Sequence, residues 1–195
     1  MARGRKQDYD GALADCEPVI ALDPASSESY FTRALIWRWK NDFDRAIADY
    51  SRGIDIDPNY GAAYYGRGSS WLRKDEYDRA IADFDRALEL DPDVTNAYVD
   101  RGFAWTAKLD ASRAIADFDK AIAHDPIDAD AYFGRGANRA SQADHNGAIA
   151  DYSRAIELDP TNAGVYDGRS FSWKAKGNHK RAEADRQKAL SLEAN

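Results

Sequence analysis

The sequence predicts an all-α protein built as a right-handed solenoid of antiparallel helix pairs. Proline recurs every 34 residues and each time ends the same short phrase, ALDP, DIDP, ELDP, AHDP or ELDP; these prolines are Pro24, Pro58, Pro92, Pro126 and Pro160. Aromatic, small and alanine residues fall into fixed columns between them. A constant period of about 20 to 50 residues is typical of repeat architectures, in which each unit buries its apolar face against its neighbours.

The first half of each row has the pattern of one packed helix face. The rows begin at Ser27, Gly61, Thr95, Ala129 and Ala163. A tyrosine column comes first (Tyr30, Tyr64, Tyr98, Tyr132, Tyr166), then a small column (Ala34, Gly68, Gly102, Gly136, Ser170), then a mostly tryptophan column (Trp37, Trp71, Trp105, Arg139, Trp173). Large, small and large residues at this spacing indicate an amphipathic helix.

The second half of each row predicts a second helix. Its columns are alanine (Ala46, Ala80, Ala114, Ala148, Ala182), then a mostly aromatic column (Tyr50, Phe84, Phe118, Tyr152, Arg186), then a small column (Gly53, Ala87, Ala121, Ala155, Ala189). A polar stretch between the halves supplies helix-stop and helix-start residues. Proline then ends the second helix, because its ring cannot continue the hydrogen-bond ladder.

These rows divide the chain into repeats, and the two end repeats differ from the others. We expect a partial repeat over residues 1–26 with only a second helix, at about residues 8–22, followed by repeats at 27–60, 61–94, 95–128, 129–162 and 163–195. The last repeat should end in a polar capping helix, because Glu183 and Arg186 replace apolar residues there. The leading helix lacks a covering first helix, so either the chain is a fragment of a longer array or this edge meets another chain.

The columns of tyrosine, small residue, tryptophan, alanine, tyrosine or phenylalanine, alanine and proline resemble a tyrosine variant of the tetratricopeptide repeat motif over essentially the whole chain. Arg139 in the tryptophan column departs from it, as does Ala111, which stands where other rows have Phe43 and Tyr77. The resemblance implies a non-catalytic protein-protein interaction module, whose ligand is a peptide or helix of a partner protein held in a concave groove.

The resemblance also implies that first helices line this groove. The residues in the matching places are Phe31, Leu35, Trp39, Tyr65, Ser69, Leu72, Asn96, Val99, Phe103, Phe133 and Phe171. Aromatic groove residues suit an apolar peptide or helix, and Gly66, Gly134 and Gly168 are expected to leave room for a ligand backbone. The alternative is that individual aromatic rings contact only the next repeat.

Arginine and aspartate form two further unbroken columns, Arg33, Arg67, Arg101, Arg135 and Arg169, and Asp49, Asp83, Asp117, Asp151 and Asp185. An arginine between packed helices needs a carboxylate or carbonyl partner, because its desolvation is otherwise costly. We therefore expect a structural ladder of Arg–Asp pairs. The alternative is a row of arginines that binds a ligand.

The remaining features argue against several functional classes. The net charge of −7 disfavours a nucleic-acid surface, and no apolar run is long enough to cross a membrane. The three histidines are scattered, and the glycines follow the repeat without forming a phosphate-binding loop, so no enzyme, cofactor or metal site is expected. The single Cys16 and the lack of a visible signal peptide favour a reduced, cytoplasmic setting.

Two predictions concern partners. Some tetratricopeptide repeat proteins bind chaperone tails through a clamp of cationic side chains on successive first helices, but the matching places here, such as Gly66, Asn96 and Asp100, hold no cation. We therefore expect no chaperone-tail carboxylate clamp. Self-association through the uncovered N-terminal half-repeat, which would make the chain a scaffold, is the alternative to peptide binding.

Overall fold

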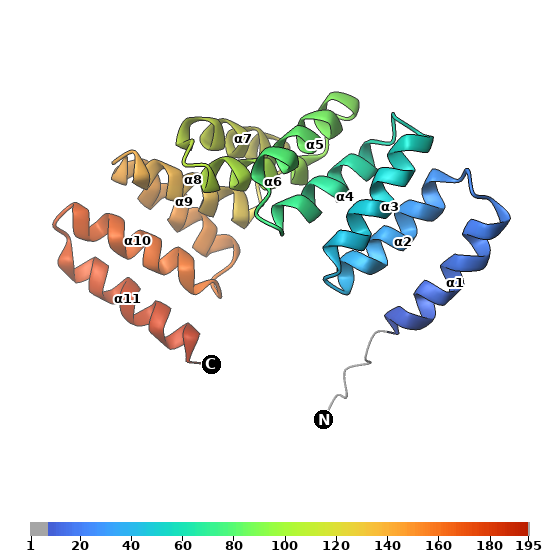
Figure 1. Ribbon diagram of the computed structural model, residues 1–195. Coiled ribbons are helices and arrows are strands. Elements are labelled where there is room, and N and C mark those ends of the chain that lie inside the picture. The colour runs from blue at the N-terminus through green and yellow to red at the C-terminus, as the bar shows by residue number, and fades with distance from the viewer. Residues whose placement is uncertain (1–7, 195) are drawn as a thin grey trace. The chain divides into compact units, whose positions relative to one another are not determined.

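The computed structural model describes residues 8–194, and this part of the chain consists of eleven α-helices with no strand (Figure 1). The all-α, helical-repeat class that the sequence predicts is confirmed. The chain divides into two compact units, residues 1–92 and residues 93–195. Each unit is a series of antiparallel helix pairs joined by short turns.

The first unit contains α1 (Tyr9–Leu22), α2 (Ser27–Trp39), α3 (Phe43–Ile56), α4 (Gly61–Leu72) and α5 (Tyr77–Leu90). Helices α2 and α3 form one hairpin, and α4 and α5 form the next. Helix α3 packs against α4, and α2 lies along α4. Of the described helices in this unit, α1 contacts α2 alone.

The second unit contains α6 (Thr95–Ala107), α7 (Ala111–His124), α8 (Ala129–Ser141), α9 (His145–Leu158), α10 (Ala163–Ala175) and α11 (His179–Glu193). Consecutive helices pack against one another throughout, and the first helices α6, α8 and α10 also contact their neighbours directly. In the two units the first helices α2, α4, α6, α8 and α10 begin 34 residues apart, at Ser27, Gly61, Thr95, Ala129 and Ala163.

In α3, α7 and α9, a ring of the second helix fills the space between two successive first helices. In the second unit Phe118 of α7 is fully buried, and a Cβ atom added at Gly102 of α6 or at Gly134 of α8 would lie 2.9 or 2.3 Å from its ring. A Cβ at Gly66 or Gly168 would likewise lie 2.5 or 2.6 Å from a tyrosine ring. The expectation that glycines leave room for a ligand backbone is therefore wrong at Gly66, Gly134 and Gly168, because core rings occupy that room.

The turn inside each hairpin has the same backbone conformation despite different residues. One residue per turn has a positive φ in the left-handed region: Asn41 (59°), Asp75 (60°), Leu109 (61°), Ala143 (62°) and Gly177 (75°). The left-handed region is unfavourable for residues with a Cβ atom and is worst tolerated by bulky ones. The helix pairing therefore imposes the turn, and the sequence at Leu109 does not favour it.

Replacing Leu109 with glycine should stabilise the second unit. Leu109 is 91% exposed, so little packing is lost. Relief of the left-handed strain exceeds the extra entropy of glycine in the unfolded chain, and we expect a gain of about 0.5 to 1 kcal/mol in the free energy of unfolding. Chemical denaturation would measure this change, and Gly177→Leu should lower stability in the matching turn. Equal stability of the wild type and Leu109→Gly would contradict the prediction.

Two buried tyrosines should make stability fall at high pH. Burial raises the pKa of Tyr50 to about 12, and burial together with nearby Asp151 raises that of Tyr152 to about 12. An unfolded tyrosine ionises near pH 10, so above that pH the unfolded chain releases protons that the folded chain keeps. These contributions are complete below about pH 10 and are lost as the pH rises toward 12.

The Tyr50→Phe, Tyr152→Phe double variant should lose this part of the pH dependence. Phenylalanine already fills the same place at Phe84 and Phe118, and the Tyr50 hydroxyl has no hydrogen-bond partner among the described residues. Urea denaturation at pH 8, 10 and 11 would compare the two proteins. A decline of the same steepness in both would show that these phenols do not carry the effect.

Candidate functional site

The candidate interaction surface consists of the first-helix residues that the resemblance assigns to a groove. In the first unit, Phe31 and Leu35 of α2 and Tyr65, Ser69 and Leu72 of α4 are partly buried. In the second unit, Phe103 of α6 and Phe133 of α8 are partly buried, while Asn96 of α6 and Phe171 of α10 are exposed. Phe171 is the most open of the aromatic residues on this surface, with 61% of its area exposed.

Several of these rings also belong to the core of their own repeat. The centroids of Phe31 and Tyr50 lie 5.7 Å apart, those of Tyr65 and Phe84 lie 6.0 Å apart, and those of Phe133 and Tyr152 lie 6.2 Å apart. Each pair joins a first helix to the second helix of the same repeat. One side of these rings therefore supports the hairpin, and a ligand could contact only the other side.

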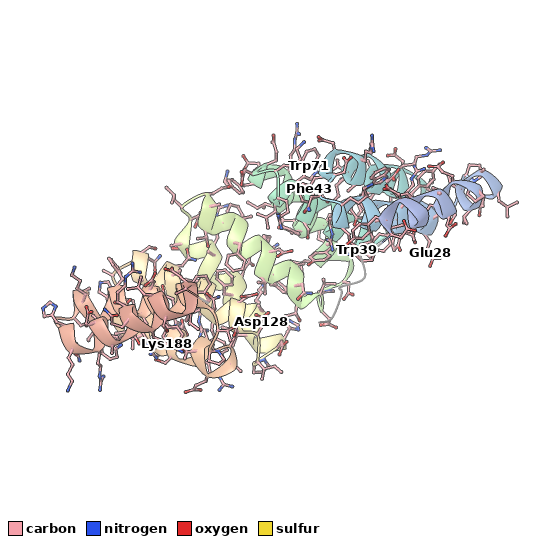
Figure 2. All side chains as sticks on the ribbon, turned by 90° about the horizontal axis from the view of Figure 1, so that it is seen from below. Glu28, Trp39, Phe43, Trp71, Asp128 and Lys188 are labelled. Carbon is pink, nitrogen blue, oxygen red and sulfur yellow. The ribbon has the colours of Figure 1, made fainter. Side chains whose placement is uncertain are left out.

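Three predicted groove residues have other surroundings. Val99 is only 7% exposed and offers no open surface. Phe171 lies edge-on to His145 of the preceding repeat, with centroids 5.9 Å apart. Trp39 is 55% exposed and lies beside Tyr9 of α1, with centroids 6.5 Å apart, so it faces the N-terminal edge. In Figure 2, Trp39 and Glu28 mark the two ends of α2.

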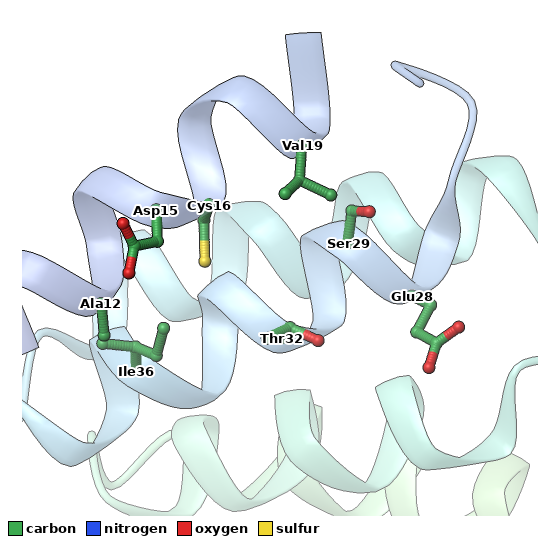
Figure 3. Close-up of a pocket in the computed structure, with 8 residues that line it drawn as sticks. All are labelled: Ala12, Asp15, Cys16, Val19, Glu28, Ser29, Thr32 and Ile36. Carbon is green, nitrogen blue, oxygen red and sulfur yellow. The ribbon is translucent and has the colours of Figure 1, made fainter. Parts of the chain in front are cut away.

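Two pockets lie between α1 and α2. The larger, of about 510 Å³, is lined by Ala12, Asp15, Cys16, Val19, Glu28, Ser29, Thr32 and Ile36. In Figure 3, Val19 stands opposite Ser29, and Ala12 lies next to Ile36. The smaller pocket, of about 300 Å³, continues along the same two helices and is lined by Asp8, Tyr9, Ala12, Ile36 and Trp39. The two pockets together form an open slot along α1 and α2.

Arginine and aspartate pair in all five full repeats, as the columns predict. In every pair the arginine Nε donates to one carboxylate oxygen of the aspartate sixteen residues later, and Nη2 donates to the other, at 2.6 to 3.0 Å. The aspartates are buried and the arginines mostly so. A bidentate, charge-assisted pair of this kind fixes both the distance and the orientation of the two helices.

The remaining arm of four of these arginines reaches the preceding second helix. Nη1 donates to a residue sixteen positions earlier, and the pairs are Arg33 with Glu17, Arg67 with Ser51, Arg135 with Asp119 and Arg169 with Ser153, at 2.6 to 3.1 Å. The bond with Asp83 raises the pKa of the Arg67 guanidinium above its ordinary value. Because three of their nitrogens are engaged, these arginines connect repeats, and the ligand-binding alternative has no support at these four positions.

Two coupled replacements were not foreseen. Four rows stack an arginine on the tryptophan column, at 3.9 to 4.7 Å from the guanidinium carbon to the ring centre. The row with Arg139 has Gly147 in place of that stacking arginine, and Arg139 instead donates to Asp151 at 2.8 Å. In the last row, Asp167 and Arg186 replace the ring pair with an ion pair at 2.6 Å. Each departure occurs together with a second one in the same row. This co-occurrence is the feature of the sequence from which the two contacts could have been predicted.

The described part of the chain contains no cluster of three or more histidine, cysteine or acidic residues that could hold a metal ion. No helix within residues 8–194 is both long enough and apolar enough to cross a membrane. His145 and His179 begin corresponding helices, α9 and α11.

Removing Asp151 should destabilise the second unit more than removing an exposed carboxylate of the same network. Asp151 accepts three bonds from two arginines, so Asp151→Ala leaves two partly buried cations without their partner. We expect a loss of about 2 to 4 kcal/mol in the free energy of unfolding. Asp119→Ala, which removes only the half-exposed partner of Arg135, should cost less than about 1 kcal/mol. Denaturant titration would compare them, and losses of similar size would contradict the role given to Asp151.

Comparisons with known proteins agree with this architecture. Three models described as tetratricopeptide repeat match residues 1–61, 67–135 and 129–162. A search of curated proteins finds no match. The crystal structure of YrrB, described as a TPR protein with an unusual peptide-binding site, has a TM-score of 0.79, 21% identity and coverage of 94% of both chains.

Structures of MamA are similar as well. One has a TM-score of 0.75 and 28% identity, and the match covers 81% of this chain and 92% of that one. MamA from Desulfovibrio magneticus RS-1 has a TM-score of 0.79 and 21% identity, with 86% of this chain and 95% of that chain covered. The matching repeat models, together with the helix pairs and columns described above, show that the chain belongs to the tetratricopeptide repeat family.

Proposed function

We propose that this protein is a non-catalytic interaction module that binds a peptide or helix of a partner protein on the faces of its first helices. The observation that carries the proposal is the set of partly open aromatic rings on these helices, of which Phe171 is the most exposed. Aromatic side chains held in place and half desolvated are typical anchors for a bound segment. The likeness to YrrB, whose structure is described as having a peptide-binding site, supports the same class of function.

The ladder explains why such a surface would bind with little reorganisation. Arg135 and Arg169 tie α8 and α10 to the second helices on both sides of each, so the backbone under Phe133 and Phe171 is held in place before a ligand arrives. A rigid surface loses little conformational entropy on binding, and the ligand loses most of it. Specificity would then come from the spacing of apolar residues along the ligand.

A displayed random-peptide library selected against the full chain tests this proposal. The selected peptides should carry spaced apolar residues, and their affinity should fall at least tenfold in Phe171→Ala. Ile127→Ala is the matched control, because Ile127 is also an exposed apolar residue, 68% exposed, but lies in the turn before α8. Failure to select any peptide, or equal losses in the two variants, would count against the first-helix surface.

Self-assembly through the N-terminal edge is a second candidate function, favoured by the exposed apolar side chains on α1. Val19, which lines the larger pocket, is 54% exposed, and Leu22 is 88% exposed. Light scattering over a range of concentrations would decide it. A monomer at every concentration removes this candidate, whereas a mass that rises with concentration and falls back in Val19→Ser, Leu22→Ser supports it.

A further inference from the structure

The slot between α1 and α2 has an internal template for its occupant, because the same helix surface is covered elsewhere in the chain. In α3, Ala46 is fully buried and Asp49 is 7% exposed. Ala12 and Asp15, which stand 34 residues earlier in the same columns, line the open pocket of about 510 Å³. In α3 this surface is covered by the first helix of the same repeat, α2. The slot on α1 therefore has the shape of a place for one further helix.

Asp15 is the ladder carboxylate of this slot. Its counterparts in the five full repeats all accept two bonds from an arginine on the covering helix. Asp15 is exposed, and no hydrogen bond or ion pair reaches it from any described residue. The occupant that completes the pattern thus carries an arginine.

A second position defines the occupant further. Where four other second helices have the arginine that stacks on tryptophan, α1 has Gly11 and α9 has Gly147. The surrounding sequences match as well, GALAD over residues 11–15 and GAIAD over residues 147–151. On α9 this glycine accompanies a covering helix with Arg139, whose aliphatic Cδ lies 2.9 Å from the place of a Cβ at Gly147. The surface of α1 therefore matches that of α9, on which glycine leaves room for a second arginine of the covering helix.

We propose that the slot between α1 and α2 binds an amphipathic helix of a partner protein that carries two arginines four residues apart, both of them on Asp15. The template is α8, whose Arg135 and Arg139 both donate to Asp151. A small residue next to the first arginine would lie over Asp15 and Cys16, as Gly136 lies close to the Cβ of Asp151 and to the Tyr152 ring in the α9 pair. The net charge of −7 also favours a cationic partner.

The apolar part of the slot supplies contact area for such a helix. Ile36, buried at 6% exposure, lines both pockets, and Val19 and Trp39 stand half-exposed on opposite sides. Cys16 and Thr32 face the larger pocket (Figure 3). At the corresponding place of the next junction, the Tyr50 ring lies against Gly66. A cysteine in place of a ring leaves more room at this point, so the partner helix can carry a larger side chain there.

The first experiment uses a labelled peptide of residues 128–142, which contains the α8 sequence, and measures its binding to the full chain by fluorescence anisotropy. In this peptide Gly134 can be replaced with alanine, which raises the helicity of the peptide. Glycine is required at this position only by the contact with Phe118, which the peptide does not make. We expect Asp15→Asn to weaken the peptide at least tenfold. Asp55→Asn, which removes the same charge from an exposed position on α3, should leave the affinity within twofold of the wild type.

A variant that exchanges the preference between two peptides distinguishes binding at this site from nonspecific electrostatic attraction. Gly11→Arg should weaken the α8 peptide and strengthen a peptide of residues 94–108, in which Trp105 replaces the second arginine. The Asp42–Arg45 and Asp110–Arg113 pairs show that an arginine fits three residues after an aspartate helix cap, as it would after Asp8. Replacing both arginines of the α8 peptide with glutamine should abolish its binding to the wild type.

The outcomes are distinguishable from those for the first-helix surface. Phe171→Ala should not affect the α8 peptide, so this site can fail or hold independently of the proposed function. No binding of the α8 peptide, or equal losses in Asp15→Asn and Asp55→Asn, would overturn the proposal. A chain that dimerises without peptide, and does so only with Asp15 intact, would replace the partner helix with a second copy and would also overturn it.

Discussion

The architecture depends on one ion pair that recurs in every full repeat. Each arginine of the ladder holds the aspartate of its own repeat's second helix with two parallel bonds, and Arg33, Arg67, Arg135 and Arg169 also donate to the second helix before it. A guanidinium group has a fixed planar geometry, so three helices that share it cannot slide freely relative to one another. Apolar columns supply the burial, but small and large residues alone would tolerate several packings. The ladder selects one of them.

Most of this fold was predictable from the period of the sequence. The 34-residue spacing fixes the helix pairs and the turns, and the equal regularity of arginine and aspartate predicts their pairing. The details that were missed depend on geometry between columns. Val99 looks like a groove residue by position but is buried, and Gly66 looks open but faces the Tyr50 ring. A sequence column records the position of a residue in its helix, and it does not record which neighbour fills the space beside it.

Two departures from the motif follow the same geometry, because contacting columns change together. Arg139 appears with Gly147, and Asp167 appears with Arg186. In both cases a contact between two large side chains is replaced by a contact of another chemistry and of similar reach, so the helix spacing is kept. A residue that departs alone would leave a cavity or an unpaired charge, which costs more than the paired change. Such pairs can therefore be read from a single sequence when the repeat supplies its own internal alignment.

The third arm of the arginine has a consequence for how the array comes apart. At the junctions of Arg33 with Glu17 and of Arg135 with Asp119 the partner is charged, and at those of Arg67 with Ser51 and Arg169 with Ser153 it is a neutral hydroxyl. Each compact unit thus contains one ionic and one neutral junction. Salt screens exposed charges and leaves hydroxyl bonds nearly unchanged, so ionic strength acts on the ionic junction of each unit more than on the neutral one. Where cooperativity is the sum of nearest-neighbour couplings, the boundary between folded and frayed repeats within each unit would then shift with the salt concentration of the surroundings.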